Sequence, residues 1–320
     1  MAATRGTLLE HALAARPAQS GLDRSVRLQT AGIPDGSSPW TAPIRGRPIG
    51  RFDQLSFASG RLVHPVYYAG DAQAPTLLLL PEIAGFAPGL QMFAERLIDA
   101  RFRVFVPWLF GPLGTRAPRR NGIRLCISRE FAYLRAGVSS PITTWLRALS
   151  AHISKYSGGA PIGVIGMCLT GAFAIPLVID PQVAAAVAAQ PAVPLSPLFV
   201  AFGIAKKRRL SQLNVSDSEI AQARARLDAG RAHLLAVRCR PDRMCPHAKI
   251  ARLQREFPLG LEIREYAEAG ERNCLGERPH ATFTREYRLA QNASADHYSR
   301  RAFTDLVAFF DTHLRAAPRP

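Results

Sequence analysis

Lysine is scarce in this 320-residue sequence, which contains four lysines against 37 arginines. The 41 basic residues outnumber the 24 acidic ones, so the formal net charge is +17. A nucleic-acid-binding surface would gather its basic residues in a patch or stripe beside a recognisable motif. The arginines are instead scattered through every region, as the codon bias of a high-GC genome would place them. We therefore expect no nucleic-acid partner.

Cysteine is also sparse, and its number is odd. The five cysteines are Cys126, Cys168, Cys239, Cys245 and Cys274. The N-terminus lacks the apolar stretch and small-residue cleavage site of a signal peptide. Together these features favour a reduced, cytoplasmic compartment over a disulfide framework. Cysteine and histidine spacings match no zinc pattern, and we expect neither a metal nor another cofactor.

Charged residues are missing from residues 161–179, a run close to the length of a membrane span. Glycine and proline interrupt this run, and its pattern changes partway. Residues 161–165 are typical of a short buried strand, whereas the residues from Leu169 onward are typical of a helix. A buried strand–turn–helix explains the run better than a lipid-spanning helix, so we expect no membrane partner.

The rest of the composition is that of a globular protein, with 48% apolar and 20% charged residues. Residues 1–50 carry scattered arginines and loop signals, which predict a flexible N-terminal extension. Residues 51–320 are expected to form one domain. Strands are predicted at 61–68, 76–80, 103–107, 162–165, 183–189, 233–237 and 261–266, and helices at 90–100, 141–156, 169–179, 216–230, 246–257 and 300–314. This alternation predicts an α/β fold with a mainly parallel sheet.

The most informative segment runs from Ile162 to Gly171 and places Cys168 between a strand and a helix. A nucleophile elbow needs such a turn, with glycine where a Cβ would clash, although Thr170 replaces the second glycine of the commoner form. The helix N-terminus favours a negative side chain, and the Leu169 N–H can bind an oxyanion. The alternative is a buried structural cysteine.

Four segments resemble the dienelactone hydrolase family, α/β-hydrolases whose nucleophile is cysteine. They are Leu80-Pro81-Glu82-Ile83-Ala84-Gly85, Gly166-Met167-Cys168-Leu169-Thr170-Gly171, Pro241-Asp242-Arg243-Met244-Cys245-Pro246 and Arg278-Pro279-His280-Ala281-Thr282. The order Cys, Asp, His along the chain is the α/β-hydrolase order. The resemblance implies an α/β-hydrolase fold, with helices on both faces of the sheet, that hydrolyses a small ester or lactone.

This resemblance assigns a role to each member of a catalytic triad. Cys168 is the nucleophile, His280 the base and then the acid, and Asp242 the residue that orients the histidine. His247 and His297 are weaker candidates for the base. The residues alone leave two alternatives open, because His280 could be a solvated loop histidine and Asp242 a helix cap.

Glu82 directly follows a five-residue apolar strand, where a carboxylate would be poorly solvated. The resemblance implies a gate that hydrogen-bonds the resting cysteine and swings away when substrate binds. Ile83 would then supply the second oxyanion N–H beside Leu169. A glutamate at a loop or helix start is the alternative.

The sequence departs from the family at the arginines that hold a substrate carboxylate in the enzyme after which the family is named. Residues 108–112 contain no arginine, and Arg285 comes one residue later than the pattern. Arg285 is nonetheless the candidate for substrate binding. Two functions follow: a cysteine hydrolase of small esters or lactones, or a catalytically silent α/β-hydrolase-fold protein that binds a small ligand or partner. No pattern indicates an oligomeric state.

Overall fold

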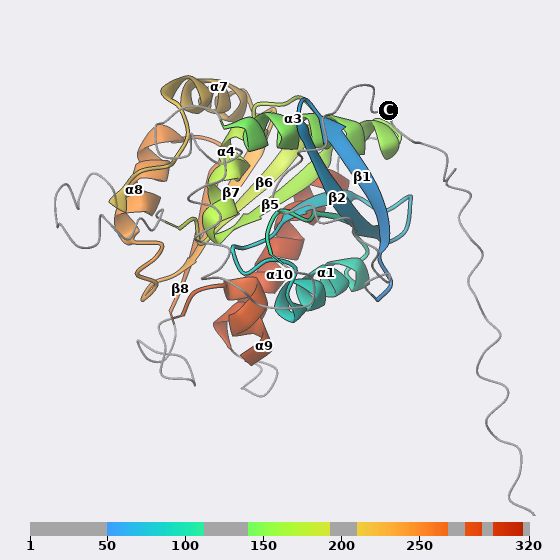
Figure 1. Cartoon of the computed structure of the whole chain (residues 1–320). Helices are drawn as coiled ribbons and strands as arrows, with labels where there is room; N and C mark the ends of the chain where they lie inside the picture. The colour runs from blue at the N-terminus through green and yellow to red at the C-terminus, as the bar shows by residue number, and fades with distance from the viewer. Residues whose placement is uncertain (1–49, 112–139, 193–209, 268–278, 290–296, 316–320) are drawn as a thin grey trace, which may run out of the picture. The chain divides into compact units, whose positions relative to one another are not determined.

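The computed structural model describes residues 50–111, 140–192, 210–267, 279–289 and 297–315 (Figure 1). All of these residues belong to one compact unit. The N-terminal extension predicted for residues 1–50 lies outside the described residues apart from Gly50. Its boundary with the domain therefore stays a prediction.

An eight-stranded sheet forms the centre of the domain, in the order β1-β2-β4-β3-β5-β6-β7-β8. The strands are β1 (Asp53–Ser59), β2 (Leu62–Ala69), β3 (Thr76–Leu80), β4 (Arg103–Pro107), β5 (Ile162–Met167), β6 (Val183–Ala189), β7 (His233–Cys239) and β8 (Leu261–Tyr266). Strand β2 pairs antiparallel with β1 and with β4, and the remaining pairs are parallel. The predicted mainly parallel α/β sheet is confirmed.

Strand β3 is buried on both faces of the sheet, which therefore lies between two apolar clusters. Its five residues are all buried. Leu78 and Leu80 belong to the apolar cluster on one face, and Leu77 and Leu79 belong to the cluster on the other. A continuous apolar run is what a strand between two helical layers requires.

Helices α3 (Pro141–Tyr156), α4 (Ala174–Leu177), α7 (Asp217–Asp228) and α8 (His247–Glu256) pack their apolar residues into one of these clusters. Helices α1 (Pro88–Asp99) and α10 (Tyr298–Phe310) cover the other face (Figure 1). Helix α7 begins with a capping box, in which Ser216 and Glu219 satisfy each other's backbone N–H groups. In the described part of the chain, no helix is long and apolar enough to cross a membrane.

Several predicted elements have the predicted ends, among them strands 76–80, 103–107, 183–189 and 261–266 and helix 141–156. Three features differ. Strand β1 has no predicted counterpart. The helix predicted at 169–179 is a 3₁₀ helix, η2 (Cys168–Phe173), followed by the short α4. A π-helix, η3 (Thr282–Glu286), follows the loop that carries His280 and leads into α9 (Tyr287–Leu289).

Candidate active site

Cys168 is the first residue of η2, directly after β5, and its backbone is strained. Its φ is 56°, in the left-handed region that side chains other than glycine rarely adopt. A Cβ at Gly166 would lie 2.3 Å from the carbonyl oxygen of Thr170, so this position requires glycine. A Cβ at Gly171 would lie 2.9 Å from the Cα of Pro191. The backbone therefore has the geometry of a nucleophile elbow.

Thr170 connects this elbow to the end of β3 through hydrogen bonds. Its buried hydroxyl accepts a hydrogen bond from the Met167 N–H at 2.9 Å. The same hydroxyl lies 3.2 Å from the carbonyl oxygen of Pro81, to which it can donate. Because Pro81 directly precedes Glu82, Thr170 joins the elbow to the loop that carries Glu82 and Ile83.

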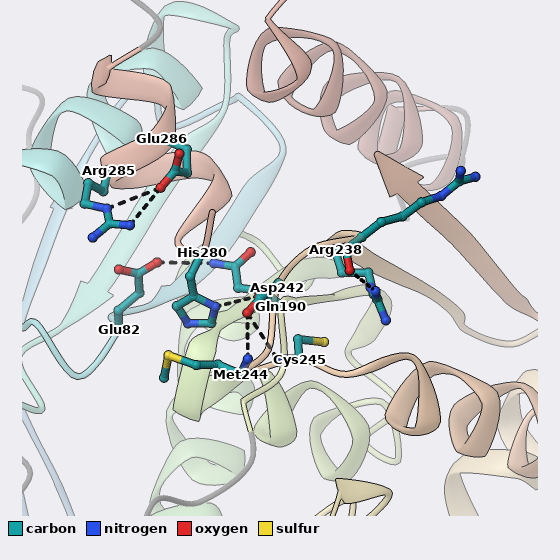
Figure 2. A network of polar contacts seen from close by, with 10 residues as sticks. Glu82, Gln190, Arg238, Asp242, Met244, Cys245, His280, Arg285 and Glu286 are labelled. Atoms are coloured by element: carbon teal, nitrogen blue, oxygen red, sulfur yellow. Dashed lines mark hydrogen bonds and ion pairs between the residues drawn. The ribbon is translucent and has the colours of Figure 1, made fainter. Parts of the chain in front are cut away.

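His280 and Asp242 form a buried pair in the loops that follow β8 and β7 (Figure 2). His280 Nδ1 lies 2.6 Å from Asp242 Oδ2. The other carboxylate oxygen accepts the N–H groups of Met244 at 2.8 Å and Cys245 at 3.2 Å. The Asp242 side chain is 2% exposed and the His280 side chain 14%. The carboxylate thus fixes the orientation of a ring that retains an accessible edge.

Cys168 and His280 act on each other electrostatically. Burial lowers the pKa of His280, but electrostatic attraction to Cys168 and the hydrogen bond that His280 donates to Asp242 raise it more, to well above 6.5. No hydrogen bond of regular geometry joins His280 Nε2 to a described residue, so this ring nitrogen is not held by another side chain. The imidazolium form is therefore stabilised beside the thiol.

Glu82 is 8% exposed, and two side chains bind its carboxylate. Gln190 Nε2 donates to Oε1 at 3.2 Å (Figure 2), and the Thr284 hydroxyl donates to Oε2 at 3.0 Å. The resting contact with Cys168 that the resemblance implies stays a prediction. Sequence reasoning missed both holders of the carboxylate. Gln190 had a signal, because it is the first polar residue after the apolar run of β6.

The remaining candidates lie at the same edge of the sheet or close to it. Leu169 is the second residue of η2, where a backbone N–H has no partner within its own helix. Ile83 follows Glu82 and packs against the apolar cluster that contains Cys168. Arg285 bonds to Glu286 at 3.0 Å, so part of its charge is already neutralised by a fully buried carboxylate.

The two weaker candidates for the base, His247 and His297, have different partners from His280. The side chain of His247 is 75% exposed and lies 3.7 Å from Glu265. His297 caps α10 by accepting the Ser299 N–H. No group of three or more histidine, cysteine, aspartate or glutamate residues in the described ranges is placed to hold a metal ion.

The sheet order, the helices on both faces and the cysteine elbow define an α/β-hydrolase fold. The model of the dienelactone hydrolase family matches residues 63–230, more than half of the chain, so the protein belongs to this family of hydrolases.

Solved structures show the same fold at low identity. A dienelactone hydrolase from Anabaena variabilis is 12% identical with a TM-score of 0.52, and the match covers 83% of this chain and 100% of that one. The dienelactone hydrolase-like promiscuous phosphotriesterase P91 from metagenomic libraries is 12% identical with a TM-score of 0.54, covering 82% and 98%. No curated protein sequence matches the chain.

Proposed function

We propose that this protein hydrolyses a small carboxylic ester or lactone through a cysteine acyl-enzyme. The observation that carries the proposal is the strained Cys168 beside His280, which Asp242 holds at 2.6 Å. A thiol becomes a strong nucleophile when a base takes its proton, and a carboxylate that fixes the tautomer makes the base effective. A structural cysteine would need neither the strained turn nor the oriented histidine.

The proposed reaction begins when Cys168 Sγ attacks the carbonyl carbon and the carbonyl electron pair moves to its oxygen. The backbone N–H groups of Leu169 and Ile83 would stabilise this oxyanion. Collapse breaks the ester C–O bond, and the leaving alkoxide takes a proton from His280. A water molecule then gives a proton to His280 and attacks the thioester. The C–S bond breaks, which releases the acid and restores the thiolate.

Arg285 donates to Glu286 through Nε and Nη2, so part of its charge is neutralised before an acidic group of a substrate could bind. We therefore expect neutral short-chain esters and lactones to be better substrates than carboxylate-bearing ones.

Limited iodoacetamide at pH 7 is expected to label Cys168 before any other cysteine and to abolish ester hydrolysis in step with labelling. The matched comparison is Cys245, which is also buried. Burial and the adjacent Asp242 raise the pKa of Cys245 to about 12, so its thiol stays protonated. Peptide mapping of partly labelled protein gives the order in which the cysteines are alkylated.

Labelling of Cys245 as fast as Cys168 would overturn the assignment of the nucleophile. Fast labelling of Cys168 without turnover of any short acyl ester or lactone would favour the silent, ligand-binding alternative. The Cys168→Ala variant serves as the blank in both measurements.

We propose in addition that Glu82 gates the Cys168 thiol and exchanges a proton with it. Replacing Glu82 with glutamine removes that exchange and is expected to lower kcat by a factor of about 10–10³ while KM changes little, as for the loss of an acid–base partner. The free energy of unfolding should fall by no more than about 1 kcal/mol, because the amide relieves a buried charge. Gln190 can turn its Oε1, which has no partner among the described residues, toward the new amide.

Glu219→Gln is the matched control, since Glu219 is a buried glutamate in the capping box of α7. That variant should lose stability and keep its kcat. Wild-type turnover in Glu82→Gln would instead remove Glu82 from the mechanism.

A further inference from the structure

Lys249 is buried close to the elbow, although the mechanism above does not use it. It is the third residue of α8 and is 1% exposed, a rare state for lysine unless a partner neutralises it. Its Nζ donates to the carbonyl oxygen of Ala192 at 2.9 Å. In the part of the chain that the structure describes, no carboxylate pairs with this ammonium group.

Ala192 connects Lys249 to the nucleophile. The Ala192 N–H donates to the carbonyl oxygen of Cys168 at 2.9 Å. Two residues earlier, Gln190 holds the carboxylate of Glu82. The short segment 190–192 therefore touches Glu82 through a side chain, Cys168 through its N–H group and Lys249 through its carbonyl group.

The Lys249 ammonium group also interacts electrostatically with the thiols of Cys245 and Cys168. Burial lowers the pKa of Lys249 to about 8, and attraction to Cys245 and Cys168 raises it again in part. These two thiols, from the Asp242 loop and the elbow, are the acidic groups that act on the ammonium. The Lys249 ammonium is thus charged at neutral pH and loses its charge above about pH 8.

This placement is unfavourable for stability. The ammonium is buried, has no carboxylate partner and lies in the first turn of a helix, where the macrodipole repels a cation. Because its folded pKa lies below the ordinary value of 10.5, the unfolded chain binds the proton more tightly. The burial penalty is therefore complete below about pH 8 and is relieved as the pH rises toward 10.5. A costly buried charge beside a nucleophile indicates a role in reactivity.

We propose that Lys249 is a positioning residue for Cys168, because it holds Ala192 against the elbow and supplies a positive charge that stabilises the thiolate. This inference rests on the proposed function, since the charge matters only if Cys168 is the nucleophile. It assigns to the α8 N-terminus a role that the triad, Glu82 and the oxyanion donors do not fill.

The first test compares Lys249→Met with wild type in the rate of Cys168 alkylation between pH 6 and 10. The midpoint of the pH profile should move up by about one unit, which corresponds to about tenfold slower alkylation below the midpoint. Lys155→Met is the control, because Lys155 lies exposed in the last turn of α3. An unshifted midpoint in Lys249→Met, with or without a lower melting temperature, would leave only a structural role and overturn the proposal.

The second test does not need a Lys249 variant to fold. Coupling between two sites is reciprocal, so removing the thiolate must also change the titration of Lys249. The chain has four lysines, so a spectrum of protein labelled with ¹³Cε-lysine contains few signals. The signal of Lys249 should titrate at lower pH in Cys168→Ser than in wild type, and an unchanged titration would overturn the proposal.

Both tests follow thiol and ammonium chemistry, and neither depends on turnover. A shifted alkylation profile in a protein that hydrolyses no ester would support the role of Lys249 and contradict the proposed hydrolysis. Ester hydrolysis that depends on Cys168 but has the same pH profile in Lys249→Met as in wild type would support the proposed hydrolysis and contradict the role of Lys249.

Discussion

Replacing Cys168 with alanine is expected to lower kcat for the best short acyl ester by a factor of about 10⁴–10⁶, the loss typical of deleting the nucleophile of a triad. The oxyanion donors and the binding surface remain, so a small rate above the uncatalysed reaction should survive. Cys168 is 4% exposed, so alanine leaves a small cavity, as in the control variant below, and it leaves the backbone strain at φ 56° unchanged. The melting temperature should therefore fall only slightly.

Cys239→Ala is the matched control for this variant. Cys239 is also a buried thiol, at the end of β7, and it packs in the apolar cluster on the other face of the sheet. It should lose some stability to the small cavity and keep full activity. Steady-state kinetics with a chromogenic ester, together with the unfolding midpoint, separates the two variants. Turnover in Cys168→Ala above one-tenth of wild type would contradict the cysteine mechanism.

Replacing Asp242 with asparagine is expected to lower kcat by a factor of about 10²–10⁴. The Met244 and Cys245 N–H groups both donate to Oδ1, so the oxygen of the new amide should stay with them. Its NH₂ group then faces His280 Nδ1 and forces that nitrogen to accept. The ring proton moves to Nε2, where the base can no longer take a proton from the thiol.

The same variant changes how stability depends on pH. In wild type the pKa of His280 is raised above 6.5, so the folded protein binds this proton more tightly than the unfolded chain. The resulting stabilisation is complete below about pH 6.5 and is lost as the pH rises through the folded pKa. In Asp242→Asn the pKa of His280 should fall, and this part of the pH dependence should shrink.

Asp180→Asn is the control for the loss of a buried, paired carboxylate. Asp180 is paired with Arg147, with the Arg147 Nε at 2.9 Å from Oδ1, and neither residue belongs to the proposed triad. Its replacement should lower the unfolding midpoint and leave kcat unchanged. A wild-type kcat in Asp242→Asn would reduce Asp242 to a loop-capping residue.

The core of the fold could be predicted because its signals are local. The run Thr76–Leu80 is apolar throughout, and the pattern of 141–156 repeats at helical spacing, so both elements have the predicted bounds. Strand β1 had no such signal. It lies at the edge of the sheet, with Phe57 as its only fully buried residue, so its sequence is mostly polar and its pairing with β2 decides its conformation.

The same distinction applies to the candidate site: the parts with a local sequence signal could be predicted, and the parts that depend on distant contacts could not. The elbow at Cys168 is a local strand–turn–helix pattern, and the loops of Asp242 and His280 follow strands that the sequence predicted. Gln190 and Thr284 could not be assigned, because their roles arise only where distant strand ends meet. Lys249 had a weak signal, since it lies four residues before the buried Leu253 and so on the same face of α8.

The long-range hydrogen bonds of the site have a consequence for how the chain acquires its reactivity. The bond between Thr284 and Glu82 joins residues 202 apart, and that between Gln190 and Glu82 joins residues 108 apart. Contacts of such separation form late in folding, after the loops between them have been closed. During synthesis, Cys168 is made long before His280, and its thiol therefore lacks a base until the C-terminal segment has been added. Under the proposed mechanism, a nascent or misfolded chain therefore carries an ordinary thiol, and only the finished domain carries an activated one.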